Sequence, residues 1–364
     1  MLRSTIWDLK PHTLGKHKVL RNYLNGWLPI MARWNGRILF IDGFAGPGEY
    51  RGGEPGSPII AMAALQEHKA RMNIKAEVGF IFIEKDNDRV KHLSSLVKPM
   101  LASLPKTAWV NIHHSTFDEK LTEVLDKLDA QTKNLAPAFV MVDPFGVSGT
   151  PMSIIQRILG SPKSEVYISI QYEAINRHKD SSEFEEPLDA LFGSSDWRKG
   201  RDIEGSDKRK NFFYNLYEQE LRRAGAKHVL HFELYEGSRL VYAIFHGSQH
   251  ELGSDLMKKA IWGVAPWGNF KFRPYGESQL LLDFTTPDLS PLQGQIENEF
   301  RGRNWVTIEK ITSFVQSDRT NYHSGHLKKG ALTPMEKQDR IEVDETTRKR
   351  KITYPPGTIL RIKP

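Results

Sequence analysis

The sequence predicts an α/β fold built on a mostly parallel sheet that ends in an antiparallel hairpin, followed by a smaller C-terminal domain. Short β-rich runs alternate with helical segments through the first half of the chain, and such alternation requires crossover connections between parallel strands. The last two runs, His228–Tyr235 and Leu240–His246, have only four residues between them, which predicts a hairpin. A length of 364 residues exceeds that of one typical domain, so we expect two domains.

The first half of the chain supplies the predicted elements in order. Apolar residues at helical spacing predict an N-terminal helix over Lys16–Met31, in which Pro29 marks a kink or boundary. The predicted strands are Arg37–Ile41, Val78–Ile83, Trp109–His113, Phe139–Val142 and Val166–Ile170. The predicted helices are Asp88–Leu101, Phe117–Leu128 and Asn211–Ala224, with a charged insertion around 172–210. Five parallel strands and a terminal hairpin are typical of Rossmann-like methyltransferases and differ from the all-parallel sheet of dinucleotide dehydrogenases.

The C-terminal part of the chain has a different pattern. A strand near Gln279–Phe284 and a linker around Thr285–Asp288 are predicted first, so we expect one domain over 1–286 and a second over 287–364. The helices predicted after the linker are Pro291–Arg301, Ile308–Gln316 and Tyr322–Leu332, and the strands are Asp339–Val343 and Thr358–Ile362. Between these strands lies a basic run whose members we expect to bind nucleic acid: Arg348, Lys349, Arg350 and Lys351. This pattern predicts a winged helix-turn-helix domain, and the alternative is a small helical cap with a solvated charged loop.

Composition excludes several kinds of chemistry. The chain has no cysteine, which excludes disulfides, cysteine-ligated metal sites and thiol nucleophiles. His323 and His326 are three residues apart, but no obvious third ligand lies nearby in the sequence, so no metal site is predicted. The net charge of +7 favours a polyanion such as DNA or RNA, and an ordinary solvated basic surface is the alternative. No apolar run has the length of a signal peptide or a membrane span, so we expect a soluble, cytoplasmic protein with no membrane partner.

The first candidate site follows the strand that ends at Ile41. Glycine has no Cβ and tolerates positive φ, so the glycine-rich stretch Asp42–Gly48 allows the backbone to approach a ligand closely. Its glycines are spaced G-x-x-G-x-G, whereas the dinucleotide fingerprint is G-x-G-x-x-G. The candidate cofactor-binding residues here are Asp42, Gly43, Phe44, Ala45, Gly46 and Gly48. An ordinary tight turn is the alternative.

Two further groups of polar residues come at the ends of the next strands. Glu84 ends the second strand, where a carboxylate can accept hydrogen bonds from both hydroxyls of a ribose, although exposed acids are common at strand ends. After the third strand, Asp118 is placed to hold an adenine amino group and Phe117 to pack on the ring. The alternative for this stretch is a helix N-cap made by Thr116 or Asp118, and the two interpretations are compatible.

The most informative motif is Asp143–Gly146, at the end of the fourth strand. Ligands of open α/β folds bind at the carboxyl ends of the strands. There Asp143 and the carbonyl of Pro144 can accept hydrogen bonds from an exocyclic amine, which aims its lone pair at an electrophilic methyl group, while Phe145 can stack on the base. The predicted catalytic residues are Asp143, Pro144, Phe145 and Gly146. A strand-ending Asp-Pro turn without function is the alternative.

These residues resemble the family of three-Cys-motif partner proteins, TcmP. The most specific part of the match is the signature Ile41–Tyr50. It is accompanied by Lys16-His17, Tyr23-Leu24, Trp27, Gly56-Ser57-Pro58, Glu84 and Asp143–Gly146, and it extends to the C-terminal segment, so it covers most of the chain. The resemblance implies a class I methyltransferase fold, S-adenosylmethionine as cofactor, and a partner with a three-cysteine motif similar to radical-SAM proteins.

The motif Asp143–Gly146 is also similar to that of tRNA guanine-N2 dimethyltransferases. It is more loosely similar to the Asp/Asn-Pro-Pro-aromatic motif of adenine-N6 enzymes, in which Phe145 would replace the second proline. We therefore expect an S-adenosylmethionine-dependent N-methyltransferase that acts on an exocyclic amine of a base in DNA or RNA. The alternative is a nucleic-acid-binding partner protein that keeps the fold without turnover. An NAD-dependent oxidoreductase is opposed by the glycine spacing and by the terminal hairpin.

Overall fold

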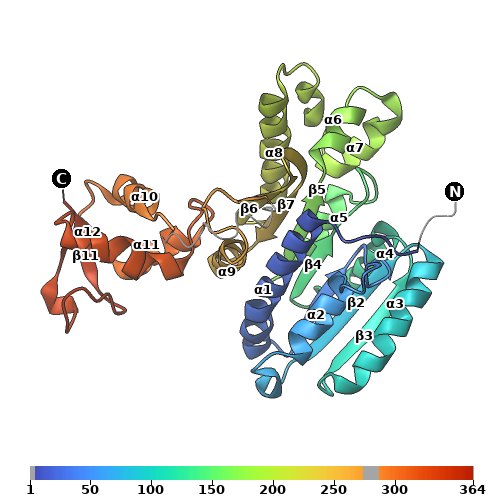
Figure 1. The fold of residues 1–364 in the computed structure, drawn as a ribbon, viewed down its shortest axis with the longest axis horizontal. Helices are drawn as coiled ribbons and strands as arrows, with labels where there is room; N and C mark the ends of the chain where they lie inside the picture. Colours follow the sequence, from blue (N-terminus) through green and yellow to red (C-terminus); the bar gives the residue numbers. More distant parts are fainter. Residues whose placement is uncertain (1–4, 274–286, 364) are drawn as a thin grey trace. The chain divides into compact units, whose positions relative to one another are not determined.

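The computed structural model describes residues 5–273 and 287–363, which form two compact units (Figure 1). The first unit contains residues 5–250 and 271–273, and the second contains residues 251–270 and 287–363. The strand predicted near Gln279–Phe284 lies outside the described residues.

The first unit is built on an eight-stranded sheet in the order β3-β2-β1-β4-β5-β7-β6-β8. The strands are β1 (Arg37–Asp42), β2 (Glu77–Glu84), β3 (Ala108–His114), β4 (Ala138–Val142), β5 (Glu165–Ile170), β6 (His228–Glu236), β7 (Arg239–Ser248) and β8 (Lys271–Phe272). Strands β1 to β5 pair in parallel, and β7 pairs antiparallel with both β5 and β6. The predicted α/β class, with five parallel strands and a terminal antiparallel hairpin, is confirmed. The short β8 was not predicted.

Eight α-helices of the described residues belong to the first unit. They are α1 (Pro11–Trp34), α2 (Ser57–Gln66), α3 (Asn87–Met100), α4 (Phe117–Ala130), α5 (Met152–Gly160), α6 (Tyr172–His178), α7 (Glu185–Phe192) and α8 (Ser206–Arg223). The N-terminal helix begins five residues before its predicted start at Lys16 and continues for five residues past Pro29, so this proline does not end the helix although it lacks the N–H of an ordinary helical residue. The charged insertion predicted around 172–210 contains α6 and α7 (Figure 1).

Aromatic side chains join α1 to the centre of the sheet. Strands β4 and β5 are buried along their whole length, as expected for parallel strands covered on both faces. The ring of Phe139 on β4 lies 5.0 Å from the ring of Tyr23 and 6.0 Å from that of Trp27, both on α1, and it stacks on Phe40 of β1. This packing fixes α1 against the sheet and beside α2, and so determines where the N-terminal turns of α1 lie (Figure 1).

The second unit combines helices with a small antiparallel sheet. Its helices are α9 (Glu251–Trp262), α10 (Ser290–Phe300), α11 (Ile308–Gln316) and α12 (Thr333–Lys337), and a π-helical segment over Leu327–Leu332 leads into α12. Its strands are β9 (Val306–Thr307), β10 (Ile341–Val343) and β11 (Ile359–Ile362), in the order β10-β11-β9. The two predicted C-terminal strands correspond to β10 and β11, which pair antiparallel, and β9 was not predicted. The helix predicted over Tyr322–Leu332 begins later and runs on to Lys337.

Helix α9 packs with the second unit, which therefore begins earlier along the chain than the predicted boundary between residues 286 and 287. The physical reason is a buried lysine on this helix. The ammonium of Lys258 donates hydrogen bonds to the carbonyls of Val315, Ser317 and Thr320, the last two at 2.7 and 3.3 Å. Burial lowers the pKa of Lys258 to about 7. These carbonyls follow or end α11, so the lysine supplies donors that the end of that helix lacks.

The substitution Lys258→Met is expected to destabilise the second unit alone. It leaves three buried carbonyls without this donor, which costs roughly 2–4 kcal/mol in total. Hydrogen exchange followed by mass spectrometry should show faster exchange in α11, with no change in β1 to β5. Lys259→Met, at the exposed neighbouring position, is the matched control. Faster exchange spread over the first unit would contradict the assignment of α9.

Candidate functional site

The glycine-rich loop after β1 is hydrogen-bonded to the ends of both neighbouring strands. The N–H of Gly43 donates to the carbonyl of Met141 on β4 at 2.9 Å, and the N–H of Ala45 donates to the carbonyl of Ile83 on β2 at 2.9 Å. Because β1 lies between these strands in parallel register, its loop meets both at the same edge of the sheet. The loop is therefore a fixed part of the sheet edge.

Glycine is required at two positions of this loop. A Cβ built at Gly43 would lie 2.3 Å from the ring of Phe117, which is buried on α4. Gly48 has a φ of +88°, and a Cβ there would lie 2.6 Å from Leu93. Side chains at these positions would displace the loop.

Asp42, at the end of β1, is a fully buried carboxylate. Its Oδ1 accepts a hydrogen bond from the N–H of Phe44 at 3.1 Å, while Oδ2 is buried and accepts none from the described residues. Burial raises the pKa of Asp42 to about 6. Asp42 is 0% exposed and lines neither of the two cavities at this edge of the sheet, so its predicted contact with a cofactor stays a prediction.

Glu84 holds the loop from the side of β2. Its Oε2 accepts a hydrogen bond from the N–H of Gly46 at 2.9 Å, and Oε1 accepts one from the N–H of Asp86 at 2.8 Å. Carboxylate oxygens have further lone pairs, so these bonds leave capacity for a ligand. The predicted contact of Glu84 with ribose hydroxyls stays a prediction.

Of the residues predicted after the third strand, Thr116 caps α4 and Phe117 packs in the interior. Thr116 is the N-cap residue of α4, and its N–H donates to Glu119 at 3.4 Å. Asp118 lies in the first turn, where a carboxylate is favourable. Phe117 is buried and stacks on Phe44 with a centroid distance of 5.9 Å. The capping interpretation therefore holds for Thr116, and the proposed adenine contacts of Phe117 and Asp118 stay predictions.

The motif Asp143–Gly146 leaves β4 beside the glycine-rich loop. The carboxylate of Asp143 forms an ion pair with the ammonium of Lys16 on α1. The carbonyl of Pro144 accepts a hydrogen bond from Nε2 of Gln171 at 3.3 Å, and Phe145 is 73% exposed. Gly146 has a φ of +107°, which lets the chain turn after the exposed ring.

The ion pair sets the charge states around Asp143. Burial alone would raise the pKa of Asp143, but the ammonium of Lys16 outweighs burial and holds that pKa below its ordinary value. Burial likewise opposes the charge of Lys16, and Asp143 raises the pKa of the lysine above its ordinary value. Burial lowers the pKa of the adjacent His17 to about 3, so this imidazole is neutral at pH 7. The pair is thus an ionised carboxylate and an ammonium.

Two cavities adjoin this edge of the sheet and share Phe44 and Phe145 as lining residues. The larger cavity, of about 300 Å³, is lined by Glu84, Phe117 and Asp118 among others. The smaller one, of about 40 Å³, is lined by Gly46, Gly48, Lys16 and Asp143 among others. The structure therefore brings most of the predicted residues of the first unit to the lining of these two cavities, whereas Asp42, Pro144 and Gly146 line neither.

Sequence reasoning missed two residues of this site. Lys16 was noted only as part of the family resemblance, and nothing local in the sequence indicates its partner. Trp7 lines the smaller cavity, its ring lies 5.8 Å from that of Phe145 in an edge arrangement, and the guanidinium of Arg89 lies 4.7 Å from the Trp7 ring. Trp7 stands before α1 in a stretch without regular structure, so no periodicity could have identified it.

In the basic run of the second unit, Arg348 is buried and the other three residues are exposed. Arg348 was predicted to bind nucleic acid, but its side chain is 1% exposed and forms ion pairs with Glu336 and Glu345. Its charge is therefore used inside the unit and is not presented to a ligand. Lys349, Arg350 and Lys351 are exposed, as their predicted role requires.

Neither a metal cluster nor a membrane span is found in residues 5–273 and 287–363. No three His, Asp or Glu side chains there are grouped so that they could hold a metal ion. His323 and His326 instead lie against each other, with ring centroids 3.8 Å apart, and His326 packs on Trp262. None of the helices there has the length and apolar character needed to span a bilayer.

Comparison with known proteins gives only distant likenesses. No protein-family model and no curated protein matches the chain. Among solved structures, Trm1 from Pyrococcus horikoshii in complex with S-adenosyl-L-methionine has a TM-score of 0.39 and 12% identity, over 71% of this chain and 61% of Trm1. The putative methyltransferase yhhF from Escherichia coli has a TM-score of 0.30 and 14% identity, over 63% of this chain and 85% of its own.

A third likeness is to the human methyltransferase 10 domain containing protein, with a TM-score of 0.31 and 13% identity, over 64% of this chain and 82% of its own. The chain thus spans 61% of the length of Trm1, less than two thirds. TM-scores below 0.5 are too low to establish activity or substrate for this chain.

The substitution Asp42→Asn is expected to change how stability depends on pH. The folded protein holds the Asp42 proton with a pKa of about 6, above the ordinary value of 3.8, so it binds more protons than the unfolded chain between these values. The free energy of unfolding contributed by Asp42 therefore falls as pH rises from 4 to 6, by about 3 kcal/mol.

Asparagine does not titrate, so the stability of Asp42→Asn relative to the unmodified protein should rise by that amount between pH 4 and pH 7.5. Urea unfolding at both pH values measures this difference. Asp202→Asn, at an exposed position, controls for the change in net charge. A relative stability that does not change with pH would show that burial of Asp42 carries no such cost.

Proposed function

We propose that this protein is an S-adenosylmethionine-dependent N-methyltransferase that acts on an exocyclic amine of a base in nucleic acid. The observation that carries the proposal is the position of Asp143–Gly146 next to the glycine-rich loop at the carboxyl edge of the sheet. Phe44 from the loop and Phe145 from the motif line both cavities. A cofactor held by the loop and a base held by the motif would therefore meet at one place.

The described residues fit the proposed cofactor. Glu84 lines the larger cavity and retains lone pairs for ribose hydroxyls. Gly46 and Gly48 bring backbone to the smaller cavity without side chains. When bound, S-adenosylmethionine would supply an electrophilic methyl group attached to a sulfonium, whose transfer to an amine nitrogen releases a thioether and one proton.

The charge around the two cavities supports a cationic cofactor. Their lining includes five acidic side chains, Glu49, Glu84, Asp118, Glu119 and Asp143, and three basic ones, Lys16, Lys85 and Arg89. An excess of carboxylates favours a sulfonium and disfavours the pyrophosphate of a dinucleotide. This favours methyl transfer over the NAD-dependent alternative.

Asp143 and Phe145 would position the base. The pairing with Lys16 keeps the Asp143 carboxylate ionised, so it can accept a hydrogen bond from the amine and direct the nitrogen lone pair. The exposed ring of Phe145 offers an apolar face on which a base can stack. Lys16 acts as a positioning residue, because it touches the carboxylate and holds its charge state and orientation.

The remaining parts of the proposal are the fold of the second unit, the family, the partner, the target amine and the location. The order of α10, β9, α11, the helix ending at Lys337, β10 and β11 supports a winged helix-turn-helix for the second unit. A partner with a three-cysteine motif, membership in the TcmP family and the exocyclic amine as target are proposed on the resemblance, and a cytoplasmic location on the composition of the chain.

One observation favours a second candidate, a nucleic-acid-binding protein without turnover. The carboxylate that would accept the amine is already paired with Lys16. If the pair did not open to a substrate, the site would bind cofactor and nucleic acid without methyl transfer. Methyl transfer to nucleic acid distinguishes the two candidates.

The first test is transfer of radiolabelled methyl groups from S-adenosylmethionine to a panel of DNA, tRNA and rRNA. Asp143→Asn keeps the shape of the side chain but loses its charge, so we expect transfer to fall by about 10²-fold or more while cofactor affinity changes little. Asp126→Asn, on the exposed face of α4, is the control. Cofactor binding without label on any nucleic acid would favour the inactive candidate. Full turnover by Asp143→Asn would refute the role of Asp143.

The positioning role of Lys16 predicts a shift in the pH profile. Without the ammonium, burial is the largest remaining influence on the pKa of Asp143 and raises it, so Asp143 in Lys16→Met would take up a proton at higher pH. We expect the acid limb of the kcat profile to move upward by about one pH unit or more. Lys18→Met, exposed on the same helix, should leave the profile in place. A lower kcat with an unshifted acid limb would show that Lys16 has a structural role and does not set the charge state of Asp143.

A further inference from the structure

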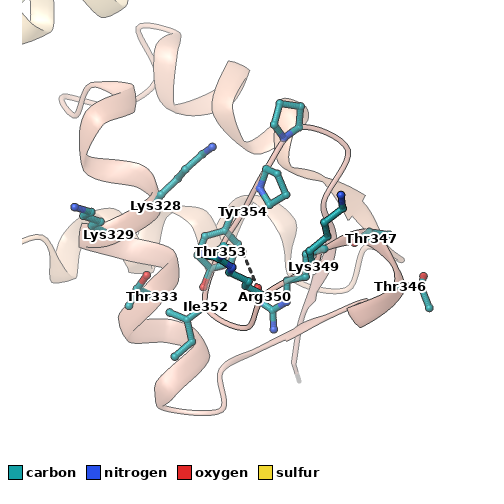
Figure 2. Close-up of a pocket in the computed structure, with 13 residues that line it drawn as sticks. Lys328, Lys329, Thr333, Thr346, Thr347, Lys349, Arg350, Ile352, Thr353 and Tyr354 are labelled. Atoms are coloured by element: carbon teal, nitrogen blue, oxygen red, sulfur yellow. Dashed lines mark hydrogen bonds between the residues drawn. The ribbon is translucent and has the colours of Figure 1, made fainter.

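The second unit contains a groove of about 800 Å³ whose charged lining is entirely basic (Figure 2). The charged lining residues are Lys328, Lys329, Arg348, Lys349 and Arg350, and no aspartate or glutamate lines it. Four threonines also line the groove, and the hydroxyls of Thr346, Thr347 and Thr353 already donate to Asp344 or Arg350 and so help to hold the loop. The groove thus presents cations, and no carboxylate in its lining neutralises them.

The cations come from two opposed elements. Lys328 and Lys329 belong to the π-helical segment before α12, and Lys349 and Arg350 belong to the loop between β10 and β11 (Figure 2). Within residues 287–363, none of these four side chains forms an ion pair with a carboxylate. Their charges are therefore available to a ligand that enters the groove.

The buried Arg348 holds the loop in place. Its guanidinium donates to both carboxylate oxygens of Glu336 on α12, at 2.9 and 2.6 Å, and Nε donates to Glu345 at 3.1 Å. The hydroxyl of Tyr354 donates to Glu336 at 2.6 Å from farther along the loop. This network joins the loop to α12 and pairs the acids of this region with Arg348, which leaves the neighbouring cations unopposed.

The charge of the whole segment points to the same kind of ligand. Residues 287–364 contain 14 lysines and arginines and 10 acids, a net charge of +4 that is more than half of the +7 of the chain. Ammonium, guanidinium and hydroxyl groups are the usual donors to phosphate oxygens of nucleic-acid backbones. The exposed Ile352 and the two prolines of the lining provide apolar surface beside them.

We propose that this groove binds the phosphodiester backbone of nucleic acid, through Lys328 and Lys329 on one wall and Lys349 and Arg350 on the other. Arg348 is a positioning residue for the loop. This inference deepens the proposed function, because it rests on nucleic acid as the substrate and names the part of it that the second unit holds. Binding through phosphates is independent of base sequence and strongly dependent on salt.

The test is fluorescence anisotropy of the full chain with a labelled 20-base-pair DNA duplex and with a labelled RNA hairpin, over a range of KCl concentrations. Two double variants remove the cations of each wall, K328Q with K329Q and K349Q with R350Q. We expect each to weaken binding to at least one probe by roughly tenfold, and to reduce the slope of log affinity against log salt by about 2. The probe that responds identifies DNA or RNA as the ligand.

The matched control is K310Q with K337Q, which removes the same charge from exposed positions of this unit that do not line the groove. Equal losses in the control and in the groove variants would overturn the proposal, since net charge alone would then explain binding. Displacement of the labelled probes by poly-glutamate as effectively as by unlabelled nucleic acid would also overturn it, in favour of an acidic protein.

Binding is measured without cofactor and repeated in an Asp143→Asn background, so its outcome is separate from that of the proposed function. If the protein without substitutions transfers no methyl group but the groove variants lose binding, the result would support nucleic-acid binding by the groove and refute the proposed methyltransferase activity. Methyl transfer to nucleic acid with unchanged binding by the groove variants would support the enzyme and refute the groove.

Discussion

The parallel pairing of β1 with β2 on one side and β4 on the other is the constraint on which the candidate site depends. Parallel strands need crossover helices, so their carboxyl ends collect at one edge of the sheet. Asp42, Glu84 and Asp143 each end or follow one of these three strands, and the pairing alone brings them to that edge. The glycine-rich loop can then bond to both neighbours because it leaves the central strand of the three.

The ion pair of Lys16 and Asp143 joins residues 127 positions apart and shows what the N-terminal helix contributes. Removing two charges from water is costly, and good pairing geometry is needed to offset that cost. The geometry depends on packing elsewhere, since Tyr23 and Trp27 hold α1 against Phe139 at the sheet centre. The charge state of the proposed catalytic carboxylate is therefore coupled to aromatic packing two to three helical turns away.

The sequence predicted β1 to β5, the terminal hairpin and the two motifs, because period and turn chemistry are local properties. It did not predict α2, which is short and so largely apolar that it lacks a clear polar face. It also did not predict α5, which is amphipathic but only nine residues long. It also placed Arg348 with its basic neighbours, although Arg348 is buried in ion pairs with Glu336 and Glu345. Such pairings depend on which elements meet in space, and neither composition nor spacing encodes that.

The cavities of the two units differ in the sign of the charge in their linings. Carboxylates outnumber cations around the two cavities of the first unit, whereas the groove of the second unit has no carboxylate in its lining. Under the proposed function each lining has a ligand of opposite charge, since a sulfonium is cationic and a nucleic-acid backbone is anionic. A single basic surface would attract the backbone but oppose a cationic cofactor, and a single acidic one would do the reverse. Placing the two charge distributions in separate units allows one chain to bind both ligands.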